Sequence, residues 1–126
     1  MKTILMLIAA LLIVAPVSMG RQAKPVKPAP PYAQFWTDFK AAVSKGDSKQ
    51  VASMTKLPFM LENKNLSEAG FIRKFDYIFD KKVKACFAKA KTVKEGEGFW
   101  VFCGQQIFIF EKVEGSYKFT EIGVND

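Results

Sequence analysis

The apolar residues of this chain change their spacing once, after Lys91, and this change restricts the fold more than any other feature. From Ala33 to Lys91 they recur every three or four residues, as they do on one face of an α-helix. From Thr92 to Ile122 they alternate with other residues, or run together, over short stretches separated by glycine. Helices followed by strands predict an α+β domain, in which N-terminal helices pack on a curved antiparallel sheet of three to four strands in a cone-shaped roll.

Local signals divide the helical half into segments. An apolar stripe that contains Phe35 and Phe39 predicts the first helix, and Gly46 ends it because glycine tolerates the left-handed conformation. Residues that favour helix N-caps predict where three further helices begin: Asp47, Ser67 and Asp80. The sequence leaves open whether the last two of these are separate helices or one kinked rod.

The second half of the chain contains three predicted strands, residues 99–103, 107–113 and 117–122, and a candidate edge strand, residues 92–95. Glu114-Gly115 is expected to form a two-residue hairpin loop between the last two strands. This register places Phe110 opposite Phe119. Further from the loop it places Ile107 opposite Ile122, unless a glycine bulge at Gly115 shifts the pairing by one residue.

Residues 4–14 form an uninterrupted apolar run near the start of the chain. At 1.5 Å per residue, a helix of this length covers about 16 Å and cannot cross a hydrocarbon core of about 30 Å. It has instead the length of the apolar region of a signal peptide, and Ser18 and Gly20 supply the small residues that precede a cleavage site. We therefore expect residues 1–20 to be a signal peptide and the protein to be exported, to the periplasm or outside the cell.

Residues 21–31 contain four prolines and three basic residues. Proline fixes the backbone and has no N–H donor, so this stretch is expected to be an extended linker and not an element of the fold. The folded α+β domain is then expected to cover residues 32–126.

Three short motifs support one family resemblance: Gly46-Asp47 after the first predicted helix, Leu57-Pro58-Phe59, and the hairpin Glu114-Gly115-Ser116-Tyr117. Together with the order of helices and strands over residues 33–122, they resemble small exported bacterial members of the nuclear-transport-factor-two-like (cystatin-like) superfamily. The resemblance implies a cone-shaped roll. It leaves the function open, since that superfamily includes enzymes, ligand carriers and dimerisation modules as well as domains of unknown role.

The chain has two cysteines, Cys86 and Cys103. Since disulfides persist in oxidising compartments, an even number of cysteines in an exported protein favours a bridge between them. The bridge would close a loop of about 17 residues and stabilise the fold by roughly 3 kcal/mol. The alternative is that both side chains are buried as small hydrophobic groups.

The chain contains no histidine, so it lacks the commonest general base and the commonest zinc ligand. Asp38, Asp76 and Tyr77 are the helical residues that could act as an acid or a base inside a cone-shaped cavity. Each of the two carboxylates lies beside the apolar stripe of its helix and not on it. The sequence therefore favours a non-enzymatic role, with no catalytic residue, metal ligand or cofactor site assigned.

Positive charge is concentrated in the third and fourth predicted helices of a chain whose net charge is +7. The basic residues are interleaved with core phenylalanines, which indicates the solvated face of amphipathic helices or, as the functional alternative, attachment to an anionic envelope surface. Export argues against nucleic acid as the partner. The residues of this basic surface are Arg73, Lys74, Lys81, Lys82, Lys84, Lys89 and Lys91.

Both faces of the predicted sheet are apolar, although a single layer of helices covers only one of them. Either the sheet curls over itself, or its second face packs on a partner such as a second copy of the chain. The candidate residues for this interaction face are Trp100, Phe102, Phe108 and Phe110.

These features favour an exported, non-enzymatic binding or interaction domain for an unidentified small ligand or protein. Two alternatives remain: a small enzyme that uses a buried Asp or Tyr inside the cone, and a structural protein of the cell envelope. A cavity filled by aromatic side chains would argue against the enzyme, whereas an open pocket with a buried carboxylate would favour it.

Overall fold

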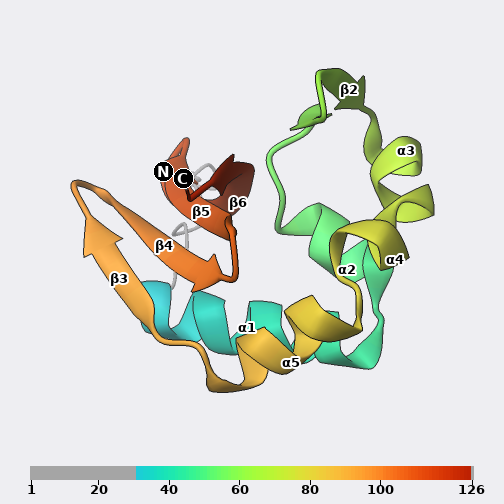
Figure 1. The fold of residues 1–126 in the computed structure, drawn as a ribbon. Coiled ribbons are helices and arrows are strands. Elements are labelled where there is room, and N and C mark those ends of the chain that lie inside the picture. Colours follow the sequence, from blue (N-terminus) through green and yellow to red (C-terminus); the bar gives the residue numbers. More distant parts are fainter. Residues whose placement is uncertain (1–30, 126) are drawn as a thin grey trace, which may run out of the picture.

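Residues 31–125 are described by the computed structural model (Figure 1), and the predicted signal peptide and most of the predicted linker lie outside this range. The helices are α1 (Tyr32–Lys45), α2 (Ser48–Ser53), α3 (Glu68–Arg73), α4 (Phe75–Ile78) and α5 (Lys81–Lys89). The strands are β1 (Phe59–Leu61), β2 (Lys64–Leu66), β3 (Thr92–Glu95), β4 (Gly98–Cys103), β5 (Gln106–Val113) and β6 (Ser116–Val124). The predicted α+β class is confirmed, and the four-stranded sheet is open, with β3 and β6 at its edges.

Local capping explains where the helices begin and end. α1 ends at Gly46, whose backbone is left-handed with a φ of 74°. Phe79 and Asp80 have non-helical backbone angles and separate α5 from α4, so this region consists of separate helices and not one rod. The three predicted N-caps are confirmed, because each side chain accepts a hydrogen bond from a backbone N–H group in the first turn: Asp47 from Gln50, Ser67 from Gly70 and Asp80 from Val83.

The main sheet has the strand order β3-β4-β5-β6, and all neighbouring strands are antiparallel. The predicted fourth strand is therefore present, at the edge, as β3. The loop between β5 and β6 consists of Glu114 and Gly115, as predicted, and positive φ values of 52° and 87° let the chain reverse within two residues. Close to this loop, Phe110 lies opposite Phe119, which confirms that predicted pair.

The predicted pairing of Ile107 with Ile122 is wrong by one residue, because Ile107 lies opposite Gly123. A bulge places one extra residue, Thr120, in β6. The Thr120 hydroxyl shares its single proton between two acceptors on β5, the carbonyl oxygen of Ile109 at 3.2 Å and the carboxylate of Glu111 at 3.0 Å. The bulge thus divides β6 into two parts.

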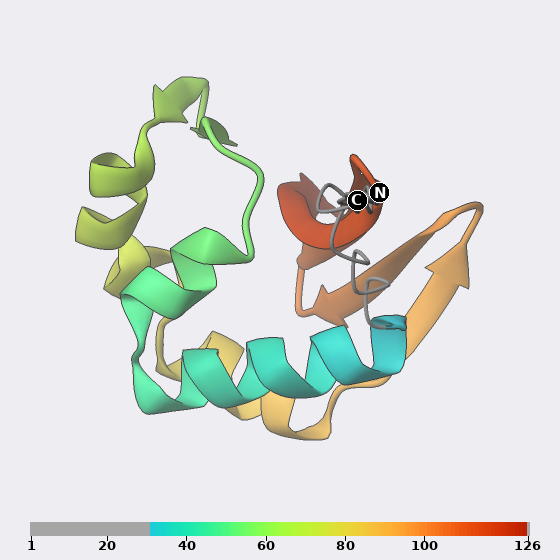
Figure 2. The same ribbon diagram turned by 180° about the vertical axis from the view of Figure 1, so that it is seen from behind.

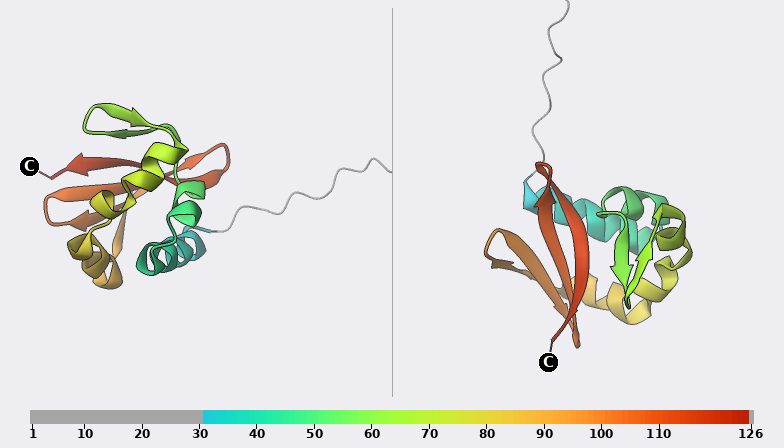
Figure 3. Two further views of the ribbon diagram at one scale, coloured as in Figure 1. Left: turned by 90° about the vertical axis from the view of Figure 1, so that its right-hand side faces the viewer. Right: turned by 90° about the horizontal axis from the view of Figure 1, so that it is seen from above.

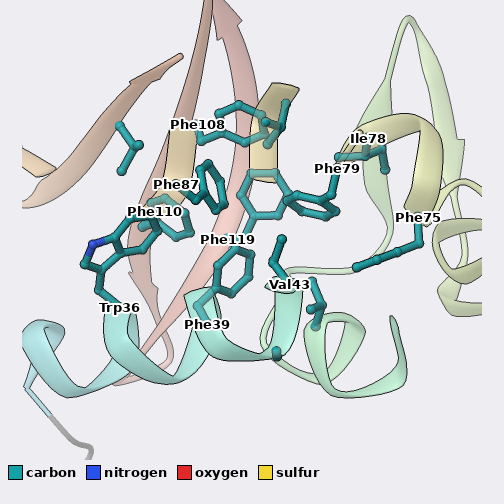
Figure 4. Packing of buried hydrophobic residues seen from close by; sticks show 14 of the residues in the cluster. Trp36, Phe39, Val43, Phe75, Ile78, Phe79, Phe87, Phe108, Phe110 and Phe119 are labelled. Carbon is teal, nitrogen blue, oxygen red and sulfur yellow. The ribbon is translucent and has the colours of Figure 1, made fainter. Parts of the chain in front are cut away.

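The space between the helices and the inner face of the sheet is filled by aromatic side chains (Figure 4). α1 and α5 lie side by side along this face (Figure 2). The Phe39 side chain has no exposed surface, and its ring lies 5.1 Å from that of Phe110 and 5.7 Å from that of Phe119, measured between centroids. Phe87 of α5 packs edge-on against Phe108 at 5.0 Å. Phenylalanine rings thus occupy the interior where the enzyme alternative would require a cavity.

Cys86 of α5 and Cys103 at the end of β4 form a disulfide bond, with their Cα atoms 5.8 Å apart. The predicted bridge is therefore confirmed, and it ties the helical layer to the sheet. Cys103 pairs with Gln106, and Gln106 pairs with Val124. The bridge consequently lies at the same end of the sheet as the last residues of β6.

Candidate functional site

A groove with a volume of about 680 Å³ lies between the β1–β2 hairpin, α4 and the end of β6. Figure 3 shows this hairpin beside β6 and next to the helical segment α3–α4. The groove is lined by four separate parts of the chain: residues 60–63 of the hairpin, residues 76–78 of α4 with Asp80, Gln106 of β5, and residues 122–124 of β6. Its volume is in the range of ligand-binding sites.

The hairpin is anchored to β6 at its base. Thr55 pairs with Phe119 in the parallel direction. The Phe119 N–H group donates to the carbonyl oxygen of Met54, and the Phe119 carbonyl oxygen accepts from the N–H group of Lys56, both at 2.9 Å. The rings of Phe59 and Phe119 then pack with centroids 4.8 Å apart. Beyond this contact, the hairpin and β6 border the groove from two sides.

A side-chain hydrogen bond joins the turn of the hairpin to α4. The turn consists of Glu62 and Asn63, whose φ values of 48° and 67° allow a two-residue loop. The Tyr77 hydroxyl donates a hydrogen bond to the Glu62 carboxylate. This hydrogen bond and the negative charge of Glu62 raise the pKa of Tyr77 above its usual value. Since the neighbouring Ile78 is buried in the core, the bond connects the hairpin turn to a fixed part of the fold.

The groove combines exposed apolar side chains with negative charge. Of the five large apolar side chains that are exposed among residues 31–125, three line the groove: Met60, Tyr77 and Val124, with exposed fractions of 52%, 58% and 68%. The charged side chains that line it are Glu62, Asp76 and Asp80, all acidic, in a chain of net charge +7. The groove is therefore suited to an apolar ligand that carries positive charge.

The outer face of the sheet differs from the predicted interaction face. Trp100 and Phe102 do lie on it, but Phe108 and Phe110 are fully buried on the opposite face, so their predicted place there is wrong. Trp100 pairs with Ile109 and Phe102 with Ile107, and side chains directly opposite each other share a face. The apolar residues of the outer face are Val93, Trp100, Phe102, Ile107, Ile109 and, near the hairpin loop, Val113.

The predicted basic surface divides between two places. Arg73 and Lys74 lie at the end of α3, and the other five residues lie on α5 or just after it. All are exposed except Lys84, whose Nζ lies 5.7 Å from the ring centre of Phe75. The buried residues of α5 face the core, so its lysines occupy the outer side of an amphipathic helix. Attachment to an anionic surface stays a prediction.

The two carboxylates considered for catalysis are exposed. Asp38 accepts a hydrogen bond from the side chain of Gln34 at 2.9 Å, and Asp76 borders the groove. Asp80 also borders the groove, but one of its carboxylate oxygens caps α5. Within residues 31–125, no group of three or more His, Cys, Asp or Glu residues is arranged to hold a metal ion. Tyr77, the third candidate, also lines the groove, where it is exposed and its hydroxyl donates to Glu62. The groove therefore offers solvated negative charge and apolar surface.

Comparison of the chain with protein-family models, with curated proteins and with solved structures found no match. The resemblance to the nuclear-transport-factor-two-like superfamily therefore stays a prediction. Among the helices of residues 31–125, none is long and apolar enough to cross a membrane.

The groove was not apparent in the sequence because its walls are distant along the chain. Met60 and Val124 are separated by the whole of α3, α4, α5 and the first three strands of the sheet. The one local signal is Tyr77, an aromatic residue beside Asp76 and off the apolar stripe of its helix. Such a residue marks exposed aromatic surface, but only the packing of the hairpin against β6 places the other residues around it.

Proposed function

We propose that this protein is an exported, non-enzymatic interaction domain that holds its ligand in the groove between the β1–β2 hairpin, α4 and β6. The observation that carries this proposal is the gathering of exposed apolar side chains at one place, since Met60, Tyr77 and Val124 line the same groove. Apolar surface left in water costs free energy, and a bound partner that covers it recovers that cost.

The interior of the domain supports a role in binding and not in catalysis. An enzyme would need a nucleophile, acid or base held in a cavity that shifts its pKa. Phenylalanine rings fill the interior, and the carboxylates of Asp38 and Asp76 are exposed to solvent. The ligand is therefore expected to be bound at the surface and released unchanged.

Export is supported by two independent features. A disulfide such as Cys86–Cys103 persists in oxidising compartments and is rare in the reducing cytosol. Residues 1–20 have the pattern of a signal peptide. The ligand is then a component of the cell envelope or of the medium.

A photoreactive amino acid in place of Met60 tests the groove, because this side chain is half exposed and lines it. In cells that export the protein, this variant is expected to give one discrete cross-linked adduct, which disappears when Asp76→Lys is added. The matched control carries the photoreactive residue at Lys49, which is exposed on α2 and does not line the groove. Equal cross-linking at both positions, or none at position 60, would contradict the proposal.

The outer face of the sheet supports a second proposal, self-association. Val93 and Phe102 are 43% and 38% exposed there, on either side of the half-buried Trp100. A dimer that covers this patch would remove apolar surface from water. Sedimentation over a series of protein concentrations checks this, and a Phe102→Lys variant is expected to remain monomeric. A wild-type protein that is monomeric throughout the series would exclude self-association.

A further inference from the structure

The outer edge of β6 carries unpaired backbone groups beside the groove. The N–H group of Asn125 donates to the carbonyl oxygen of Gln105 at 2.7 Å, so this part of the backbone is directed toward β5. Successive residues of an antiparallel strand direct their backbone groups alternately to one edge and the other. Gly123 therefore points toward β5, whereas Ile122 and Val124 point away from it. Within residues 31–125, their N–H and C=O groups have no hydrogen-bond partner.

The opposite wall of the groove has a similar free edge. The two-residue turn makes Leu61 and Lys64 the hydrogen-bonded pair that closes the hairpin. By the same alternation, the backbone N–H and C=O of Met60 point away from β2. β1 is the hairpin strand that lies near β6, and Met60 lines the groove. Both walls therefore present strand edges to the space between them.

A polypeptide backbone is the ligand that such edges recognise. Unpaired N–H and C=O groups along an edge strand are a template for one more strand, in the mode known as β-strand addition. Side chains of the added strand alternate, so those on one face would contact the apolar side chains of Ile122 and Val124. Backbone groups would supply affinity, and the lining side chains would select the sequence.

Charge selects the kind of peptide. The charged residues that line the groove are Glu62, Asp76 and Asp80, and no basic residue lines it. Complementary potentials favour lysine and arginine in the partner and disfavour acidic side chains. The chain's own basic stretch, residues 21–31, is a poor occupant because its four prolines lack the N–H donors that strand pairing requires.

We infer that the groove binds an extended segment of another polypeptide, rich in basic and apolar residues, which pairs with the free edge of β6 at Ile122 and Val124. This inference rests on the proposed function, and it names the chemical class of the ligand and the atoms that hold it. It also explains why exposed apolar side chains lie beside an open strand edge, an arrangement that otherwise promotes aggregation.

The test uses the exported protein and a synthetic peptide of about six residues, a usual strand length, in which lysine alternates with valine. Binding is followed by amide hydrogen exchange at saturating peptide. Exchange at Ile122 and Val124 is expected to slow about tenfold or more, because their N–H groups become hydrogen-bonded. Gly123 is the internal control, since its N–H already faces β5 and its exchange is expected not to change.

Three matched controls separate backbone pairing from charge. A peptide with glutamate in place of lysine is expected to bind at least about tenfold more weakly. Asp76→Lys is expected to weaken binding of the lysine peptide, whereas Asp38→Lys, the same change at an exposed carboxylate outside the groove, is expected to leave it unchanged. A peptide whose alternate backbone nitrogens are methylated retains its charge and is expected to lose binding, because the methyl groups replace the hydrogen-bond donors.

Each contrary result overturns a defined part of the inference. Saturable binding without slower exchange at Ile122 and Val124 would exclude strand pairing and leave the groove as the binding site. Equal affinity for the lysine and glutamate peptides would exclude charge selection. Slow exchange at both residues in the free protein, together with a dimer in sedimentation, would mean that a second copy occupies the edge. Absence of binding by every peptide would overturn the inference, whereas the cross-linking at Met60 decides separately whether the groove binds anything.

Discussion

The outer edge of β6 is covered by other residues in the first part of the strand and is open in the second part. Near Phe119 the edge is covered by residues 54–56, and the Phe119 side chain is fully buried. Near Val124 the edge borders the groove, and the side chain is 68% exposed. Natural sheets normally cover or blunt their edges because an open edge invites other chains. This fold therefore covers the edge of β6 where the strand is part of the core and leaves it open beside the groove.

The bulge at Thr120 lies between the two parts. An extra residue in one strand bends that strand and increases its twist. The segment that covers Phe119 does not continue along β6, because after residues 54–56 the chain passes through Pro58 into the separate β1–β2 hairpin. The groove is the space between this hairpin and the second part of β6.

The largest expected effect is at the covered part. Phe119→Ala removes a fully buried ring that packs on Phe39, Phe59 and Phe110, and it is expected to cost about 3–5 kcal/mol in the free energy of unfolding. Val124→Ala, the matched change at the open part, is expected to alter stability by no more than about 0.5 kcal/mol. Urea denaturation measures the free energy of unfolding of both variants. Similar losses of stability in the two would contradict the proposed difference between the two parts of β6.

The disulfide stabilises the end of the sheet that contains the open part. Replacing both cysteines, as Cys86→Ala with Cys103→Ala, is expected to lower the free energy of unfolding by about 3 kcal/mol. Amide exchange is expected to rise more at Gly123, at this end of β6, than at Lys118 near the hairpin loop. An equal rise in amide exchange at Gly123 and Lys118 would contradict the expected difference between the two ends of β6.

A smaller effect is expected at Tyr32, which covers the beginning of β6 from α1. Its ring stacks on Phe99 at 3.8 Å and meets the ring of Tyr117 edge-on at 5.4 Å. Its hydroxyl is buried and makes no hydrogen bond of ordinary geometry within residues 31–125. Burial raises its pKa, and the side chain of Thr92 beside it offsets part of this effect. Tyr32→Phe keeps the ring and removes the unpaired hydroxyl, so stability is expected to be unchanged or up to about 1 kcal/mol higher. A loss of more than about 1 kcal/mol, measured by urea denaturation, would show that the hydroxyl does have a partner.

The smallest expected effect concerns the hydrogen bond that joins the hairpin to α4. Only the neutral Tyr77 phenol donates to Glu62, and its raised pKa means that this bond stabilises the fold below pH 10 and is lost as the pH rises through that pKa. Glu62→Gln is expected to lower the pKa of Tyr77 toward its usual value, which an NMR titration of the ring would detect. Glu68→Gln, on α3 and not bonded to Tyr77, is the control, and an equal shift in both variants would show that Glu62 is not the specific cause.

Several features of the fold are predictable from short stretches of sequence because their causes are local. Asp47, Ser67 and Asp80 cap helices through their own side chains, and Glu114-Gly115 turns the chain because of the backbone angles these two residues adopt. The change of apolar period after Lys91 depends only on which residues must be buried, so it predicts the α+β class.

The faces of the sheet and the groove are decided by tertiary structure. Alternation shows that Trp100 and Phe108 each lie on one of two faces. The pairing of β4 with β5 places them on opposite faces, and the packing of the helices buries the face that contains Phe108. A shift of one residue reverses such an assignment, which is why the bulge at Thr120 invalidates the predicted partner of Ile107.

The sequence alone predicts the class of fold, the N-caps of α2, α3 and α5 and the last hairpin, and its pair of cysteines together with the expected compartment favours the disulfide. The tertiary packing sets where β6 is covered and where it is open, and it therefore brings Met60, Tyr77 and Val124 together. The physical reason is that capping, turns and periodicity are set within a few residues, whereas a surface built from distant segments depends on how the whole core packs.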